Sequence, residues 1–203
     1  MPDILDFVLR YAVFAAIHST LAVPAFRARL AALTGKPLSR YRLYYNLLSF
    51  LLLAWLLSAW PSPRVLYIVP GIGSLVLYLL QLLLLLAMLH CLKQTGLPAF
   101  LGLSRQPSAP ELLVTSGWYA VVRHPLYLLG ILFCAANPVM TSRWLTFTLI
   151  STTYMLIGAV IEERRLLRQH GDQYRIYRAN VPFLIPRRAN SRKKFTVPAV
   201  NAD

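Results

Sequence analysis

The sequence contains few cysteines and few acidic residues. Only Cys91 and Cys134 occur, in no CxxC spacing and in no cluster with histidine. Neither a disulfide framework nor a zinc site is therefore indicated. Seven acids stand against 21 lysines and arginines, which gives a formal net charge of +14. Because so basic a chain can bind either nucleic acid or a membrane surface, the placement of the charges decides between these partners.

The motifs of soluble nucleotide-dependent enzymes are also absent. The sequence has no internal repeat, no Walker or GxGxxG loop, and no arrangement of nucleophile, histidine and acid. It also lacks the chain of intramembrane charges that a transporter needs. A soluble cofactor-binding fold is excluded.

Long apolar runs dominate what the chain does contain. Hydrophobic residues make up 57% of the 203 residues, and the mean hydropathy is +0.54. The basic residues fall between the apolar runs, which is the pattern that orients membrane proteins, so no nucleic-acid partner is expected. The composition predicts an all-α, polytopic membrane protein with about five transmembrane helices.

Three of these spans are expected in residues 1–92, at 4–22, 43–60 and 72–92. The first begins with acidic residues instead of a basic region, so it is not expected to be a cleaved signal peptide. Within it, Asp6 and Arg10 can pair at i, i+4, and His18 is expected to be satisfied between helices. The connection at 24–42 is expected to be a cytoplasmic loop, because it has no acid and carries five basic residues: Arg27, Arg29, Lys36, Arg40 and Arg42.

Two further segments follow a cytosolic loop at 93–124 that is punctuated by glycine and proline. The first runs from Pro125 to about Ala136 and ends there, because the residue before Pro138 is pushed out of the α region. Its rise of roughly 18 Å is short of the roughly 30 Å hydrocarbon core. The segment must therefore bend on past Pro138 or form a short hairpin with the next one, at 144–161.

The stretch GWYAVVRHPLYLLG at 117–130 holds the candidate site. Pro125 is favoured at the first helical position, which makes His124 the N-cap and leaves first-turn N–H groups that attract anions. Tyr127 lies on roughly the same face as His124, and Arg123 adds a fixed fork of donors. The alternative interpretation is a snorkelling anchor beside an ordinary helix start.

A pair of acids is expected to face this stretch. The helical pattern of the fifth segment continues through EERRLLRQH to about His170, with Gly171 as C-cap. Glu162 and Glu163 then lie where membrane meets cytosol, on the side of Arg123. The alternative is a local pair between Glu162 and Arg165 at i, i+3.

Four motifs in the second half of the chain resemble those of integral-membrane methyltransferases: GWYAVVRHPLY at 117–127, EERRLL at 162–167, GDQYRIYR at 171–178 and VPFLIP at 181–186. That group includes isoprenylcysteine carboxyl methyltransferases, phospholipid N-methyltransferases and NnrU-like proteins. Within it, three other stretches look most like bacterial methanethiol S-methyltransferases: HSTLAVPAFRARL at 18–30, YRLYYN at 41–46 and NPVMTSRWLTF at 137–147.

The resemblance implies one domain over 1–203, in which 125–170 forms a catalytic hairpin and 171–203 a basic tail. It implies S-adenosylmethionine as methyl donor, bound at the cytosolic face between the last two helices and the tail. The catalytic residues it implies are Arg123, His124 and Glu162. The cofactor-binding residues it implies are Arg123, His124, Pro125, Tyr127, Glu162, Glu163, Tyr174, Tyr177 and Arg178. The chain departs from the family at one place: the usual glycine two residues after the tyrosine is Leu129 here, and Gly130 follows.

The function expected is methylation of a small thiol such as methanethiol, by direct in-line transfer. The alternatives are methylation of an isoprenylcysteine carboxylate or a lipid amine, and a non-catalytic protein that binds haem through His18 and His90, or a quinone. The protein is expected in the bacterial inner membrane, with the N-terminus outside and the C-terminus cytoplasmic. The basic run RRANSRKK is expected to bind anionic lipid head groups.

Overall fold

The computed structural model describes residues 2–35, 40–59, 63–103 and 113–187. The chain splits into two compact units. One unit contains 1–66, 96–109 and 141–143, and the other contains 67–95, 110–140 and 144–203. Lys36, Trp60, Glu111 and the basic run that follows Arg187 lie outside the described residues.

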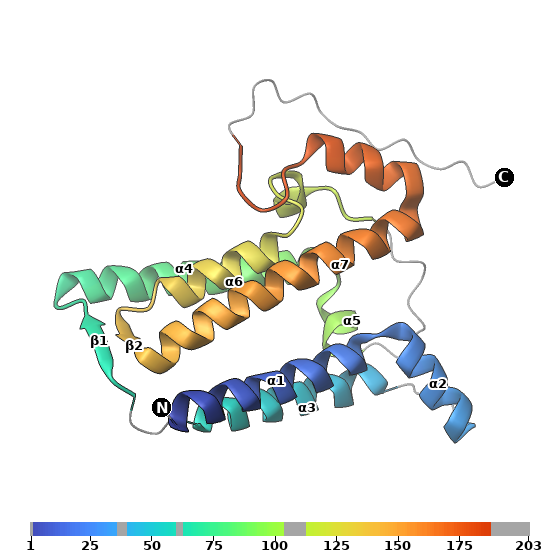
Figure 1. Cartoon of the computed structure of the whole chain (residues 1–203). Coiled ribbons are helices and arrows are strands. Elements are labelled where there is room, and N and C mark those ends of the chain that lie inside the picture. Colours follow the sequence, from blue (N-terminus) through green and yellow to red (C-terminus); the bar gives the residue numbers. More distant parts are fainter. Residues whose placement is uncertain (1, 36–39, 60–62, 104–112, 188–203) are drawn as a thin grey trace. The chain divides into compact units, whose positions relative to one another are not determined.

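The first unit is built on two antiparallel helices. α1 (Pro2–Ala22) and α3 (Tyr41–Ser58) lie side by side in Figure 1, and the short helix α5 (Leu97–Leu101) contacts α3. Arg10 pairs with Asp6 at 3.0 Å, as the spacing predicts. Arg10 Nη1 also donates to the Trp55 carbonyl at 3.2 Å and to Ser58 Oγ at 3.3 Å, which ties the start of α1 to the end of α3.

His18 is satisfied between these two helices, as expected. Its Nδ1 lies 2.9 Å from Ser49 Oγ and its Nε2 lies 2.9 Å from the Tyr45 hydroxyl. Its ring also stacks on Phe14, with centroids 5.3 Å apart. Because both ring nitrogens are engaged, His18 offers no nitrogen to a haem iron.

The connection after α1 contains a helix where a loop was expected. α2 (Pro24–Thr34) occupies the first part of what was expected to be a loop. Pro24 stands at the favoured first position, the interior is rich in alanine, leucine and arginine, and Gly35 ends the helix at φ 63°. The positive-inside rule concerns only the charge of a segment, so it does not distinguish a loop from a helix with these local signals.

The second unit contains three apolar helices, two long and one short. They are α4 (Ile72–Gln94), α6 (Pro125–Ala135) and α7 (Ser142–Asn180), with the 3₁₀ turn η1 (Gly117–Ala120) before α6. α4 and α6 lie side by side (Figure 1). Two short strands, β1 (Val65–Ile68) and β2 (Val139–Thr141), pair with each other, which the all-α prediction did not include.

α6 and α7 form the short hairpin that was one of the two expected outcomes at Pro138. With 11 residues, α6 rises roughly 16 Å, about half the hydrocarbon thickness. Its last carbonyls have no helical partner, and side chains from its neighbours satisfy two of them. Gln81 Nε2 of α4 donates to the Phe133 carbonyl at 3.1 Å, and Trp144 Nε1 of α7 donates to the Cys134 carbonyl at 2.8 Å. The helix can therefore end in an apolar setting.

α7 continues past its apolar part and then changes direction. Gly171 has φ 52° and ψ −124°, and the residues after it resume the helix up to Asn180 (Figure 1). The predicted helical extension to about His170 and the predicted end at Gly171 are confirmed. The second helical piece carries the motif GDQYRIYR back toward the N-terminal end of α6.

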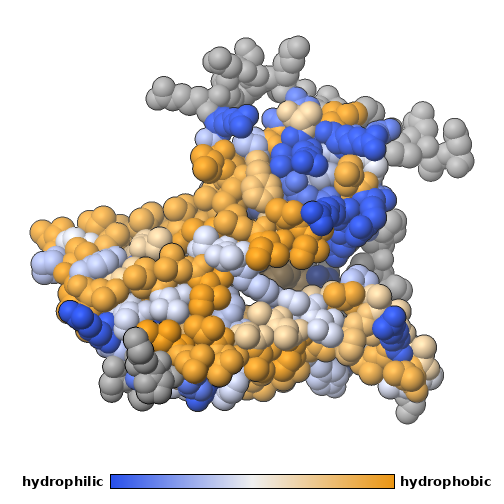
Figure 2. All heavy atoms as spheres, viewed as in Figure 1, coloured by the Kyte–Doolittle hydropathy of each residue, from blue (hydrophilic) through white to orange (hydrophobic). Residues whose placement is uncertain are grey.

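The described helices present apolar side chains outward. α1, α4 and α7 are long and apolar enough to cross a membrane by length and composition. On α4, Ile72 is 81% exposed and Leu75 is 67% exposed, which suits contact with lipid rather than water. Figure 2 shows the hydrophilic surface gathered over the C-terminal part of α7. The chain is an integral membrane protein of helical architecture.

Candidate active site

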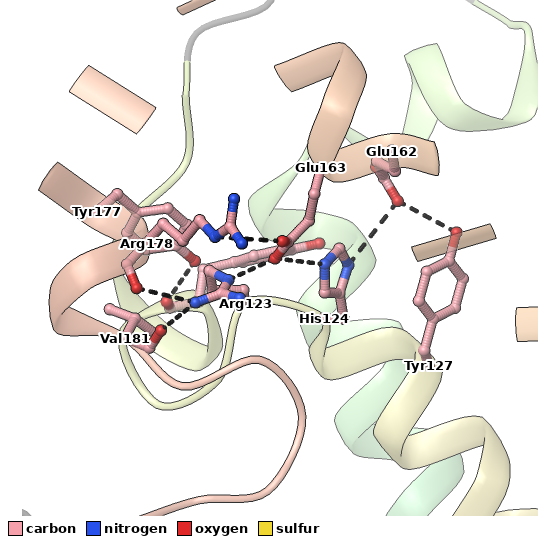
Figure 3. A network of polar contacts seen from close by, with 9 residues as sticks. Arg123, His124, Tyr127, Glu162, Glu163, Tyr177, Arg178 and Val181 are labelled. Atoms are coloured by element: carbon pink, nitrogen blue, oxygen red, sulfur yellow. Dashed lines mark hydrogen bonds and ion pairs between the residues drawn. The ribbon is translucent and has the colours of Figure 1, made fainter. Parts of the chain in front are cut away.

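The N-terminus of α6 is built as the sequence predicts. The helix begins at Pro125, and His124 is its N-cap residue without a capping side-chain hydrogen bond. His124 is buried, with 5% of its surface exposed. Its ring stacks on that of Tyr127 with centroids 5.5 Å apart, so the two residues share one face. This face points toward α7 (Figure 3).

Arg123 meets the glutamates of α7 across the hairpin, as expected. Its Nε donates to Glu163 Oε1 at 2.6 Å, and both side chains are about nine-tenths buried, at 9% and 10% exposed. Its Nη1 donates to the backbone carbonyls of Arg178 at 2.9 Å and Val181 at 2.7 Å (Figure 3). A buried ion pair is tolerable only when further hydrogen bonds satisfy it, and these two supply them.

Glu163 is surrounded by cationic and donor groups. Besides Arg123, His124 Nε2 lies 3.4 Å from Oε1 and Arg178 Nε lies 3.6 Å from Oε2. The carboxylate therefore joins the start of α6, the middle of α7 and the helical piece after Gly171. Glu163 is therefore placed to hold these three segments together.

Glu162 has a more open environment. Its side chain is 36% exposed, and its Oε2 accepts a hydrogen bond from the Tyr127 hydroxyl at 3.1 Å. His124 Nδ1 lies 3.9 Å from the same oxygen, beyond hydrogen-bonding distance. Of the two glutamates, Glu162 is the one with oxygen lone pairs available to a ligand.

The tail closes over the start of α6 through its backbone. The amide of Arg123 donates to the Pro182 carbonyl at 2.9 Å, and the amide of His124 donates to the Phe183 carbonyl at 3.3 Å. The Phe183 ring meets the His124 ring edge-on at 4.9 Å and lies 5.6 Å from the Arg123 guanidinium carbon. None of these tail residues was among the expected site residues. The signal was the motif VPFLIP, whose partner in the structure is Arg123-His124-Pro125.

Tyr174 and Tyr177 are buried and act as support. With Val181 they form an apolar cluster, and three partly buried leucines pack against it: Leu113, Leu166 and Leu167. The Tyr177 hydroxyl donates to the Tyr119 carbonyl at 2.7 Å, which fixes η1 against the piece after Gly171. Arg178 contributes its carbonyl to Arg123 and is half exposed, at 55%.

Burial sets the protonation of two groups. Desolvation lowers the pKa of His124 below its usual 6.5, although the neighbouring carboxylates of Glu162 and Glu163 oppose this. Its imidazole is therefore neutral at pH 7. Desolvation and a hydrogen bond with Cys91 raise the pKa of Tyr119, so its hydroxyl keeps its proton.

Leu129 and Gly130 lie where the chain departs from the expected glycine position. Leu129 is buried, with 5% of its surface exposed. A Cβ added at Gly130 would lie 3.6 Å from Met155 Sδ, an ordinary contact. Gly130 therefore lies on the face of α6 that meets α7, one turn below the polar residues.

The chemistry of these groups suits S-adenosylmethionine. Its ammonium and sulfonium are bound favourably by carboxylates and by the faces of aromatic rings. Glu162 provides the carboxylate, and Tyr127 and His124 provide the rings. The carboxylate of the cofactor is bound favourably by cationic groups or by N–H donors. The uncapped first turn of α6 offers such N–H groups, and the Nη2 group of Arg123 is the part of that guanidinium not used by the bonds above.

Comparison with known proteins identifies the family. The phospholipid methyltransferase family model matches residues 70–173, which includes α4, α6 and both glutamates. No solved structure is significantly similar to the chain.

Three curated relatives extend the similarity to most of the sequence. Methanethiol S-methyltransferase 2 of Bradyrhizobium diazoefficiens is 35% identical over 187 residues, which cover 88% of this chain and 71% of the relative. Methanethiol S-methyltransferase of Crocosphaera subtropica is 29% identical over 185 residues, covering 86% and 71%. Methanethiol S-methyltransferase 1 of Bradyrhizobium diazoefficiens is 34% identical over 190 residues, covering 88% and 65%. The chain therefore belongs to the phospholipid methyltransferase family of membrane enzymes, which take the methyl group from S-adenosylmethionine.

Proposed function

We propose that this enzyme methylates a small thiol, with methanethiol as the first candidate. The observation that carries the proposal is that relatives named for this reaction match 86% to 88% of the chain at 29% to 35% identity. The second candidate is methylation of a lipid amine, which the description of the matching family as phospholipid methyltransferases favours. Methylation of an isoprenylcysteine carboxylate remains the other lipophilic alternative. Membership of a methyltransferase family, together with the engaged nitrogens of His18, removes the reason to retain haem binding.

The site residues divide into two groups in this proposal. Glu162, Tyr127, Pro125 and His124 line the cofactor and acceptor positions. The supporting group holds them in place through the bonds described above: Arg123, Glu163, Tyr174, Tyr177 and Arg178. Arg123 can serve both purposes, because its Nη2 group remains for the carboxylate of the cofactor.

The reaction needs little from the protein beyond placement. When bound, S-adenosylmethionine supplies an electrophilic methyl group on a sulfonium. Glu162 and the rings of Tyr127 and His124 orient positive charge, and the tail residues Val181 to Phe183 exclude water from that end of α6. The acceptor enters from the bilayer or its surface.

We also propose the arrangement of the chain in the membrane. A single domain over 1–203 has five membrane segments, of which α6 and α7 form the hairpin, with the N-terminus outside and the C-terminus in the cytosol. The supporting pattern is the excess of lysine and arginine at 24–42, 93–125 and 162–203. The exposed Arg175 and the run after Arg187 then meet anionic head groups of the inner leaflet.

A panel of acceptors tests the substrate. The purified protein in detergent is incubated with donor labelled in its methyl group and with methanethiol, a prenylcysteine and a phospholipid amine. We expect label in the thioether product. Transfer to the lipid amine alone would establish the second candidate instead.

The two glutamates separate binding from support. We expect Glu162→Gln to weaken binding of S-adenosylhomocysteine by roughly ten- to a hundredfold, the cost of a charge-assisted bond of about 1.5 to 3 kcal/mol, with little change in melting temperature. Glu163→Gln should instead lower the melting temperature, because it leaves Arg123 buried without its partner. The reverse pattern would place the ligand at Glu163.

A further inference from the structure

His124 lies between two carboxylates that differ in their surroundings. Its Nε2 is 3.4 Å from Glu163 Oε1, and its Nδ1 is 3.9 Å from Glu162 Oε2 (Figure 3). Glu163 is held by Arg123 in a buried pair, whereas Glu162 is 36% exposed. The two ring nitrogens therefore have different chemical neighbours.

The position of Glu163 selects one tautomer of the neutral imidazole. A carboxylate can only accept hydrogen bonds, so the ring nitrogen beside it must carry the hydrogen. That nitrogen is Nε2, which leaves Nδ1 without a proton. The same logic orients histidines that a carboxylate holds in other enzymes.

The bare Nδ1 then faces Glu162 Oε2, which is also an acceptor. Two acceptors 3.9 Å apart cannot bond to each other, but both can accept from a donor placed against them. The Tyr127 hydroxyl donates to this oxygen from the other side at 3.1 Å. A donor arriving in the site therefore meets one unprotonated nitrogen and one carboxylate oxygen.

We propose that His124 Nδ1 accepts the proton of the acceptor thiol, and that Glu163 positions His124 for this by fixing the Nε2–H tautomer. The proposal rests on the function proposed above. Arg123 is less suited to this role, because its Nε and Nη1 donate to Glu163 and to two backbone carbonyls.

The step balances as follows. The S–H bond breaks, its proton goes to Nδ1 and its electron pair stays on the acceptor sulfur. That sulfur forms a bond to the methyl carbon, while the bond from this carbon to the donor sulfonium breaks and leaves its electron pair on the donor sulfur. Nδ1 later loses the proton to water, so one proton is released for each methyl group transferred.

Burial opposes a positive charge on His124, and the neighbouring charges determine how much of that cost is offset. A thiol has a pKa near 8.5 or above and imidazole one near 6.5, so the transfer is uphill. Glu162 and Glu163 both lower the cost, because the imidazolium that forms lies between them. Arg123 opposes it, but its charge is paired with Glu163 at 2.6 Å. The other groups that face the ring, Tyr127 and Phe183, are neutral.

His124→Gln is the decisive variant, because the glutamine amide can still donate to Glu163 but cannot take a proton. We expect kcat for a simple alkyl thiol at neutral pH to fall by about a hundredfold to ten-thousandfold. The loss should shrink as the pH approaches the pKa of the thiol, and it should be smaller for a more acidic thiol. Affinity for S-adenosylhomocysteine is measured beside kcat, and kcat is taken at saturating donor, so that loss of the aromatic ring from the cofactor position is separated from loss of the proton acceptor. His170→Gln, in the helical extension of α7, is the matched control.

A second measurement does not depend on activity or on a folded variant. Nitrogen-15 NMR of the histidine-labelled wild-type protein distinguishes bare from protonated ring nitrogens, and the chain has only 4 histidines to assign. We expect His124 to carry its hydrogen on Nε2 at neutral pH. An Nδ1–H tautomer, or a His124→Gln enzyme as fast as wild type, overturns the proposal. Absence of methyl transfer to any thiol by the wild type overturns instead the function on which it rests.

Discussion

Arg123 shows how one side chain can serve binding and support together. From the sequence it could be a membrane anchor or a ligand for a carboxylate. In the structure its side chain is 9% exposed. Its Nε donates to Glu163, and its Nη1 donates to two backbone carbonyls. The sequence predicts that Arg123 and the glutamates share one side, because a hairpin joins their helices. The two carbonyls could not be predicted, because they belong to residues 55 and 58 positions away.

This arrangement makes Arg123 poorly replaceable. Arg123→Lys retains the charge but cannot reproduce three hydrogen bonds from one planar group, so we expect lower thermal stability and weaker cofactor binding. Arg123→Ala breaks the buried pair, at a cost of about 3 to 5 kcal/mol. Thermal unfolding in detergent measures both. Arg175→Lys is the control, because its pair with Asp172 is 70% and 83% exposed and is worth about 0 to 1 kcal/mol. Equal losses at the two arginines would contradict the supporting role.

His124 should make stability depend on pH. Its pKa in the folded protein is lowered by burial from the value of about 6.5 expected in the unfolded chain. The folded state therefore binds fewer protons near pH 6 than the unfolded state does, so the stability present above pH 6.5 is lost as the pH falls. Melting temperatures measured between about pH 8 and pH 5 should decrease toward the acid end. His124→Gln should flatten this decrease, and an equally steep profile in the variant would assign the effect to other groups.

At the scale of elements, the site depends on the bend in α7. Without it, the motif GDQYRIYR would continue along the axis of α7 and away from Arg123. Gly171 permits the bend with φ 52° and ψ −124°, a conformation that residues with a Cβ rarely adopt. The glycine also follows the last basic residues of the helical extension, so local sequence signals sufficed to predict its place. They did not predict that helix resumes after it, because a glycine C-cap ordinarily ends the element.

Two glycine substitutions test this difference. A Cβ at Gly171 would meet nothing within 4 Å, so Gly171→Ala costs only backbone strain, about 1 to 3 kcal/mol. We expect a lower melting temperature and weaker binding of S-adenosylhomocysteine, because Tyr174, Tyr177 and Arg178 lose their placement. Gly130→Ala, in ordinary helical conformation beside Met155, should be neutral or stabilising by up to about 1 kcal/mol. A harmless Gly171→Ala would show that the bend does not position the site.

At the scale of the whole molecule, composition and motif order predicted class and family, whereas tertiary contacts decided the details. The hairpin at Pro138, the N-cap at His124 and the ion pair facing it follow from local rules and are confirmed. The bridges to the end of α6 could not be predicted. One of them depends on Gln81, a polar residue in the apolar middle of α4 that donates to a carbonyl 52 positions away. Contacts between residues so far apart produce no repeating pattern in the sequence from which they could be predicted.

The membrane orientation is the prediction that concerns the complete chain. Five segments with the N-terminus outside would place the site residues at the cytosolic face, where the cofactor is available. In the first unit, Arg10 and Arg143 both bond to the end of α3, through the carbonyls of Trp55 and of Leu57 and Ala59. These contacts put Arg10 and Arg143 at one end of that unit, which we predict to face outside. Reporters fused to each terminus measure the orientation: we expect a C-terminal reporter to be active only in the cytoplasm, and an N-terminal one only outside. Activity of the C-terminal reporter outside the cytoplasm would reverse the topology and separate the site from its donor.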